Sequence, residues 1–210
     1  MKYKIFKYAS SRIDQDGNDN VHYFSKYFAP MFAYFFYKIK FSPNSVTFIF
    51  LVTGFLSALL LYWSFPIYAY LAWRLHIILD MADGSLARAT KIFSSNAIGF
   101  DRSNHIIINT SILLAPLHFN GNIEIANGLI VSFYLYYFFS RNFISDKSTA
   151  INFSIKKNII KNILGLEGYI AAQCLVIFFE LYDFINFICY FYIFSFFLLF
   201  VVKLITRINK

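Results

Sequence analysis

The chain has 210 residues, of which 59% are hydrophobic and 14% are charged, and its formal net charge is +8. Soluble domains are about 45–50% apolar and about 25% charged, so this composition excludes an ordinary soluble domain and indicates an integral membrane protein. In such a protein, positive charge is typical of cytoplasmic loops and of contact with anionic lipid headgroups, and we expect no nucleic-acid partner.

The N-terminal region differs from the apolar remainder. Its first twenty residues contain no apolar core and no small-residue cleavage site, so we expect no signal peptide. The stretch 21–40 is aromatic, carries lysines near its ends and has Pro30 near its middle. We interpret it as a helix that lies in the cytoplasmic membrane interface. Residues 1–42 are therefore predicted to form a cytoplasmic N-terminus, and residues 43–210 a membrane domain.

Six stretches of this second region come close to the roughly 20 apolar residues that a helix needs to cross a membrane. Backbone polar groups in lipid must be satisfied within the span, so each stretch is predicted to be a helix and the fold class to be all-α. The predicted spans are about 45–64, 67–87, 97–117, 123–140, 166–182 and 184–205.

Lysine and arginine are unevenly distributed between the connections. The connections after the first, third and fifth predicted spans contain neither, whereas the other connections and both chain ends hold nearly all of them. The basic stretch 143–164 is predicted to be a loop, with or without an amphipathic helix. This pattern predicts that both termini are cytoplasmic and that the number of spans is even. Because the chain is compact and shows no targeting extension, we expect a bacterial inner membrane.

The second and third predicted spans carry charged residues. Asp80 and Asp83 are three residues apart, and Asp101 and His105 are four apart, so each pair shares one face of its helix. A short connection at about 89–96 would bring the four side chains together at the cytoplasmic end. Converging carboxylates need a counter-charge, and oxygen ligands suit Mg²⁺ or Mn²⁺.

Small residues and an arginine follow on the same helix. Gly84 and Ala87 leave room for a phosphorylated group, and Arg88 can pair with a phosphate. Together with a metal ion, these residues indicate a diphosphate site that could support phosphoryl transfer. The alternatives are helix-end charges that face lipid headgroups, and a proton or ion pathway.

The pattern from Asp80 to His105 resembles the signature of the CDP-alcohol phosphotransferase family, D-x-x-D-G-x-x-A-R-x8-G-x3-D-x3-D. The residues that match at the right spacing are Asp80, Asp83, Gly84, Ala87, Arg88 and Asp101. Upstream, the residues Pro43, Asn44 and Thr47 are similar to the P-N-x-x-T element of the same family.

The resemblance implies a six-span membrane enzyme, commonly homodimeric, that acts in phospholipid or related lipid synthesis. It would transfer a phospho-alcohol or phosphatidyl group from a CDP-linked donor, such as CDP-diacylglycerol, to the hydroxyl of a small alcohol or phospho-alcohol, and release CMP. It further implies that Asp80, Asp83 and Asp101 bind Mg²⁺ or Mn²⁺. The implied nucleotide site consists of Asn44, Thr47, Gly84, Arg88 and, in the loop, Ser94.

The chain departs from the signature at two positions. Ala97 stands in place of the second glycine, and His105 in place of the fourth aspartate, which is the family's proposed base for the acceptor hydroxyl. Three interpretations of His105 follow: a catalytic base, a neutral metal ligand, or a mark of lost chemistry. The last corresponds to a non-enzymatic homologue that binds a CDP-lipid or a protein partner.

Overall fold

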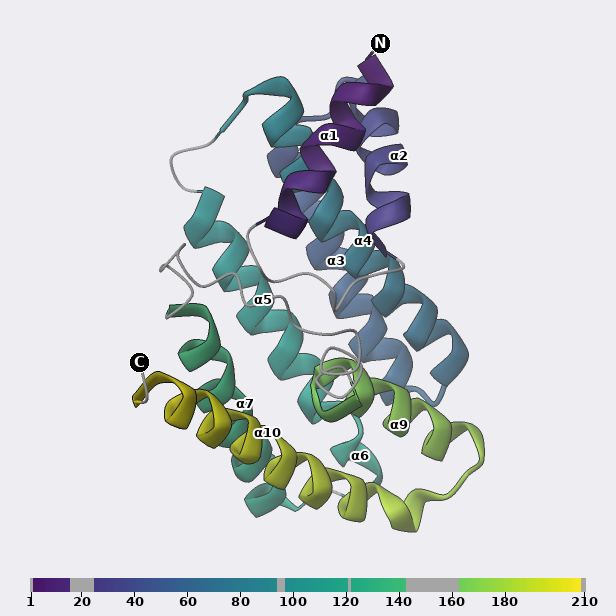
Figure 1. Cartoon of the computed structure of the whole chain (residues 1–210). Coiled ribbons are helices and arrows are strands. Elements are labelled where there is room, and N and C mark those ends of the chain that lie inside the picture. The colour runs from purple at the N-terminus through teal and green to yellow at the C-terminus, as the bar shows by residue number, and fades with distance from the viewer. Residues whose placement is uncertain (1, 16–24, 94–96, 121, 143–162, 209–210) are drawn as a thin grey trace. The chain divides into compact units, whose positions relative to one another are not determined.

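The computed structural model describes residues 2–15, 25–93, 97–120, 122–142 and 163–208, and these residues form helices and no strand (Figure 1). The elements are α1 (Lys2–Gln15), α2 (Ser25–Lys38), α3 (Pro43–Tyr62), α4 (Pro66–Thr90), α5 (Ala97–Leu114), α6 (Leu117–Asn120), α7 (Ile123–Asn142), α9 (Leu166–Phe178), the 3-10 helix η2 (Tyr182–Phe184) and α10 (Ile185–Ile208). The predicted all-α class is therefore confirmed for the described chain.

Each of the six predicted spans falls on one of these helices, namely α3, α4, α5, α7, α9 and α10. The ends differ by a few residues for physical reasons. The third span, for example, is predicted to end at about residue 117, but α5 stops at Leu114. The residue before a proline avoids the helical conformation, and Pro116 follows closely. The predicted loop 143–164 lies almost wholly outside the described residues. The helix α1 was not predicted.

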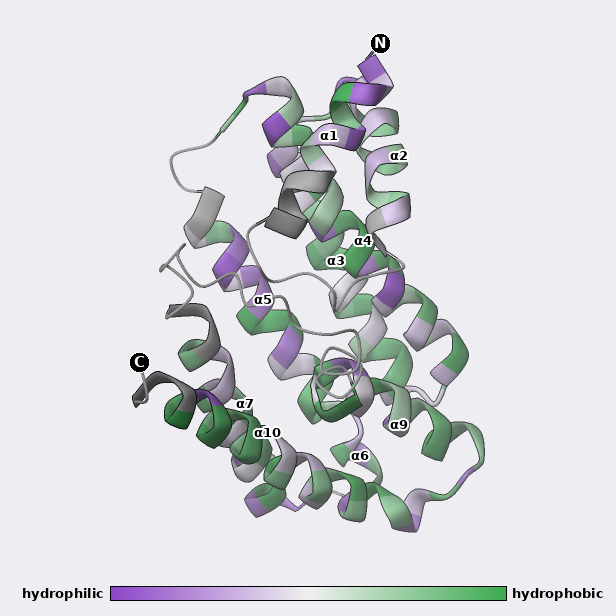
Figure 2. Cartoon of the chain, in the orientation of Figure 1, coloured by the Kyte–Doolittle hydropathy of each residue, from purple (hydrophilic) through white to green (hydrophobic). Residues whose placement is uncertain are grey.

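Two helices are long and apolar enough to cross a membrane, Pro43–Tyr62 and Tyr182–Ile205. Only 39% and 22% of their most apolar stretches are buried inside the protein, so they are not covered as core helices of a soluble protein would be. Figure 2 shows hydrophobic residues along most of α10. Exposed apolar surface of this extent favours contact with lipid. The helices of the other four predicted spans do not meet the same criteria, so six spans are not confirmed.

The chain divides into two compact units. The first consists of Met1–Leu59 and Tyr68–Asn109, and the second of Leu60–Ile67 and Thr110–Lys210. All of the predicted metal and phosphate residues that the structure describes belong to the first unit.

In the second unit, α7 and α10 pack through aromatic side chains. The rings of Phe133 and Phe196 lie 5.3 Å apart, and those of Phe139 and Phe200 5.2 Å apart, both pairs edge to face. The hydroxyl of Tyr169, on α9, donates a hydrogen bond of 2.9 Å to the carbonyl oxygen of Leu113. Such contacts contribute to the burial of Phe133, Phe196 and Tyr169.

In the first unit, the start of α3 is fixed by its sequence. The backbone N–H of Ser45 donates a hydrogen bond of 3.1 Å to Ser42 Oγ, so Ser42 is the N-cap. Pro43 follows as the first helical residue, where its fixed φ angle and missing N–H are tolerated. The cap places Thr47 one turn into α3, where it faces α4.

Several helices end at a non-glycine residue with a left-handed backbone. In the described chain these residues are Lys40, Ser64, Lys91 and Glu180, with φ angles of 62°, 61°, 59° and 58°. After α3, for instance, the N–H of Phe65 bonds to the carbonyl of Leu60 at 2.8 Å, which is the long bond of a Schellman motif. The left-handed conformation costs about 1–2 kcal/mol per residue. The chain therefore makes sharp helix ends without glycine.

Gly54 allows α3 to approach the neighbouring helices of the first unit. A Cβ atom built at this position would lie 2.8 Å from two side-chain carbons of Ile108 and 3.0 Å from Nδ1 of His76. The two distances to Ile108 are shorter than real Cβ contacts, so a larger residue at position 54 would require Ile108 or α3 itself to shift. Small residues have this role at close contacts between membrane helices.

We predict that Gly54→Ala lowers the free energy of unfolding by about 1–3 kcal/mol, because the added methyl group overpacks the contact with Ile108 and His76. Thermal unfolding in detergent measures the effect. Gly99→Ala is the matched control, since Gly99 is also helical and no atom lies within 4 Å of its added Cβ. Equal losses of stability in the two variants would contradict the close approach at Gly54.

Candidate functional site

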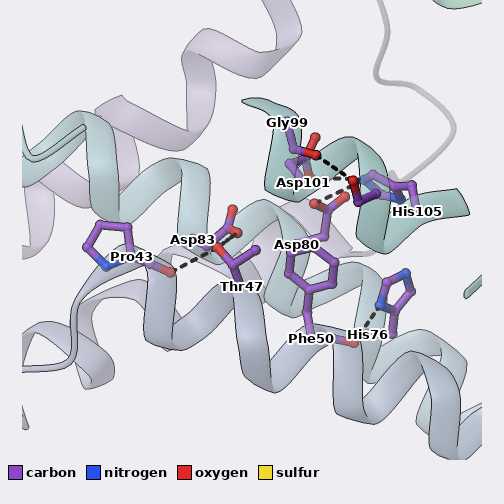
Figure 3. A network of polar contacts seen from close by, with 10 residues as sticks. Pro43, Thr47, Phe50, His76, Asp80, Asp83, Gly99, Asp101 and His105 are labelled. Atoms are coloured by element: carbon purple, nitrogen blue, oxygen red, sulfur yellow. Dashed lines mark hydrogen bonds and ion pairs between the residues drawn. The ribbon is translucent and has the colours of Figure 1, made fainter. Parts of the chain in front are cut away.

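Three polar side chains converge between α4 and α5. Nε2 of His105 lies 3.5 Å from Oδ1 of Asp80 and 3.3 Å from Oδ1 of Asp101 (Figure 3). Asp101 and His105 are one turn apart on α5, and Asp80 reaches them from α4. One imidazole nitrogen therefore faces two carboxylates that come from different helices.

The three residues fit a divalent cation by their chemistry. One ligand atom from each lies within 4.8 Å of the others. Protein ligands sit about 2.0–2.2 Å from such an ion, so atoms separated by 3.3 and 3.5 Å could share it. The side chains of His105, Asp80 and Asp101 are 17%, 31% and 30% exposed, so an ion could reach them. The same distances also fit a protonated His105 that pairs with both carboxylates.

Asp83 has a different partner. Its Oδ2 accepts a hydrogen bond of 2.6 Å from the hydroxyl of Thr47, which is also 3.0 Å from the carbonyl oxygen of Pro43 (Figure 3). Asp83 is not part of the group of three ligand atoms, although the charges of Asp80 and Asp101 act on it. The structure thus joins the predicted residues Thr47 and Asp83 to each other, beside the cluster of Asp80, Asp101 and His105.

An aromatic layer packs against His105. Its ring centroid lies 5.8 Å from that of Phe50 and 6.2 Å from that of His76. His76 is buried, its Nδ1 lies 3.0 Å from the carbonyl oxygen of Phe50, and its ring packs on Trp73. Because a carbonyl only accepts, Nδ1 carries the proton of this bond. The layer limits the orientations that the imidazole of His105 can take.

His76 is a packing residue that also lies beside the cluster. His76 lies four residues before Asp80, and this spacing places both on one face of α4. The signal was present in the sequence, but His76 is buried at the edge of the cluster and is not one of its three converging ligands.

Arg88 lies one turn beyond Gly84 on α4, as predicted. Nη1 and Nη2 of its guanidinium lie 3.2 and 3.4 Å from the position that a Cβ at residue 84 would occupy. The absence of a side chain at Gly84 thus makes room for Arg88 itself. Nε of Arg88 donates a hydrogen bond of 2.9 Å to the carbonyl oxygen of Ala9, on α1. No sequence pattern indicates this contact with the N-terminal helix.

The remaining predicted residues are less informative. Asn44 is exposed near the start of α3, three residues before Thr47. Ser94 lies outside the described residues. Ala97 is the first residue of α5. The carbonyl oxygen of Gly99 accepts a hydrogen bond from the hydroxyl of Ser103, one turn later. Neither Asn44 nor Gly99 is one of the three ligand residues of the cluster.

Comparison of the chain with family models, with curated proteins and with solved structures finds no match in any of the three. Membership of the CDP-alcohol phosphotransferase family therefore stays a prediction from the motif. The chemistry that the site can perform is inferred from the residues of this chain.

If the cluster binds a cation, Asp101→Asn should weaken Mn²⁺ binding by more than about tenfold, because loss of a supporting group alone costs about 10–100-fold. The affinity is measured by titrating Mn²⁺ into purified protein and detecting the free ion by electron paramagnetic resonance. Asp183→Asn is the matched control, since Asp183 is an exposed carboxylate of the second unit. Equal binding by the two variants would rule out Asp101 as a ligand.

Proposed function

We propose that the chain is a metal-dependent membrane enzyme that transfers a phospho-alcohol or phosphatidyl group from a CDP-linked donor to an acceptor hydroxyl and releases CMP. The observation that carries the proposal is the convergence of Asp80, Asp101 and His105 from two helices whose residues follow the family's spacing. Helix-end charges that only face headgroups would have no reason to meet at a single point.

The membrane arrangement belongs to the same proposal. The helices α3 and α10 are long and apolar enough to span, and α4, α5, α7 and α9 complete six spans with both termini in the cytoplasm of a bacterial inner membrane. The motif then lies at the cytoplasmic end, where nucleotides are available. A homodimer is the assembly that the resemblance favours.

Each residue of the site has a role in this reaction. Asp80, Asp83 and Asp101 would hold Mg²⁺ or Mn²⁺, and Thr47 orients the carboxylate of Asp83. When bound, the cation would neutralise the diphosphate and make its phosphorus more electrophilic. Arg88 would bind a phosphate oxygen of the donor.

The transfer exchanges one phosphorus–oxygen bond for another. The acceptor oxygen bonds to the phosphorus that carries the alcohol or lipid, and the bond from that phosphorus to the bridging oxygen breaks. CMP leaves with the bridging oxygen and its electron pair. The acceptor's proton passes to Nε2 of His105, where Asp80 and Asp101 stabilise the imidazolium.

A binding protein without activity is the second candidate. The pairing of His105 with two carboxylates favours it, because a permanently protonated histidine would be a structural counter-ion and no base. Such a protein would bind a CDP-lipid or a partner, but would release no CMP.

We predict that His105→Ala lowers the rate of CMP release by about 10²–10⁴-fold, the usual contribution of a general base. The assay supplies CDP-diacylglycerol, Mg²⁺ or Mn²⁺ and a pool of alcohols to protein in lipid. Mn²⁺ affinity should not fall, because the imidazole competes with the cation for the carboxylates. A parallel loss of Mn²⁺ affinity would instead make His105 a ligand. Release by His105→Asp alone, with none from the natural protein, would support the second candidate.

In the same assay, we expect Asp83→Ala to abolish metal-dependent CMP release, because it removes a carboxylate that Thr47 holds beside the cluster. Glu180→Ala, at an exposed residue after α9 in the second unit, is the control and should keep full activity. Unchanged activity in Asp83→Ala would contradict the proposed function.

A further inference from the structure

The N-terminal helix α1 is bonded to α4 at two neighbouring points. Nε of Arg88 donates a hydrogen bond of 2.9 Å to the backbone carbonyl of Ala9, 79 residues earlier in the chain. Beside it, the hydroxyls of Ser10 and Ser85 lie 2.7 Å apart. The Ser85 hydroxyl also donates to the carbonyl of Met81, so Ser10 is the donor to Ser85. Both bonds join α1 to the turn of α4 that carries Arg88.

The bond to Ala9 fixes the direction of Arg88. Long side chains on a helix lean toward its N-terminus, and the guanidinium of Arg88 accordingly lies over Gly84, 3.2–3.4 Å from the position of a Cβ there. A guanidinium has five N–H donors in one plane, and the bond to Ala9 uses one of them. With the side chain folded over Gly84 and Nε anchored, the plane of the whole group is defined.

The helix α1 is itself held in place by aromatic packing. Phe6 is 3% exposed, and its ring lies 5.7 Å from that of Tyr34 and 5.3 Å from that of Tyr37, both on α2. On the same helix, Tyr8 is 63% exposed. The face of α1 that carries Phe6, Ala9 and Ser10 is therefore the face that packs, and removal of Phe6 should loosen it.

We propose that α1 is a positioning element of the donor site: it holds Arg88 over Gly84 in the orientation that binds the diphosphate of a nucleotide donor. The inference rests on the proposed function. Arginine loses rotamer freedom when it binds phosphate, and a side chain that is ordered beforehand gives tighter binding. The helix touches no reacting atom, and acts through Arg88 alone.

A double-mutant cycle tests this route. The probe is CDP, titrated with saturating Mn²⁺ into the full chain in lipid, and the variants are Phe6→Ala, Arg88→Gln and the two combined. We expect Phe6→Ala to weaken CDP binding about tenfold, and to have no further effect once Arg88 is replaced. Tyr8→Ala is the matched control, because it removes an exposed aromatic ring from the same helix and should leave CDP affinity unchanged.

Two further measurements separate positioning from a loss of fold. Mn²⁺ affinity without nucleotide should be the same in Phe6→Ala as in the natural chain, because the cluster of Asp80, Asp101 and His105 does not contact α1 through any of these bonds. Ser10→Ala removes one hydrogen bond and keeps the aromatic packing, so it should weaken CDP binding in the same direction but less.

The outcomes are distinct. If the natural chain binds CDP and Phe6→Ala binds it equally well, the positioning role is wrong and the proposed function stands. If Phe6→Ala costs as much with Arg88 replaced as with Arg88 present, α1 acts by another route and the inference also fails. If the natural chain binds no CDP in the presence of Mn²⁺, the proposed function fails, and the inference fails with it.

Discussion

Negative charge between two apolar helices is the constraint on which the rest of the site depends. Asp80 and Asp83 on α4 and Asp101 on α5 act on one another, and repulsion between carboxylates grows as water is excluded. Each has a specific partner in the structure: His105 for Asp80 and Asp101, and Thr47 for Asp83. The site therefore depends on His105 of α5 and Thr47 of α3 as well as on the three carboxylates.

Helix α3 supports the site although it supplies no ligand to the cluster. Its cap at Ser42 fixes where Thr47 stands, and Gly54 lets the helix come close enough for Phe50 to pack on both His76 and His105. A change at Gly54 would therefore alter the orientation of the imidazole as well as the stability of the helix pair. The predicted P-N-x-x-T element thus has a structural explanation in the hydrogen bond of Thr47 to Asp83.

Helical periodicity and apolar composition were enough to predict every long helix from α2 onward, together with the pairing of Asp101 with His105, since both depend on local spacing. They could not predict α1, whose polar stretch becomes a helix through packing on α2, nor the bond from Arg88 to Ala9. Contacts between residues far apart in the chain leave no periodic signal. The position of His76 beside Asp80 could have been predicted, because the two residues are four apart on one helix.

A histidine at the position of the signature's fourth aspartate changes how charge is balanced in the site. Four carboxylates at these positions would repel one another unless a cation or protons neutralised them, whereas His105 can supply a positive charge from within the chain. A cation that binds must then compete with the imidazolium for Asp80 and Asp101, and this competition weakens its binding. In the proposed reaction the same histidine takes the acceptor's proton, and it can do so only while it is neutral and its Nε2 is not bound to the cation.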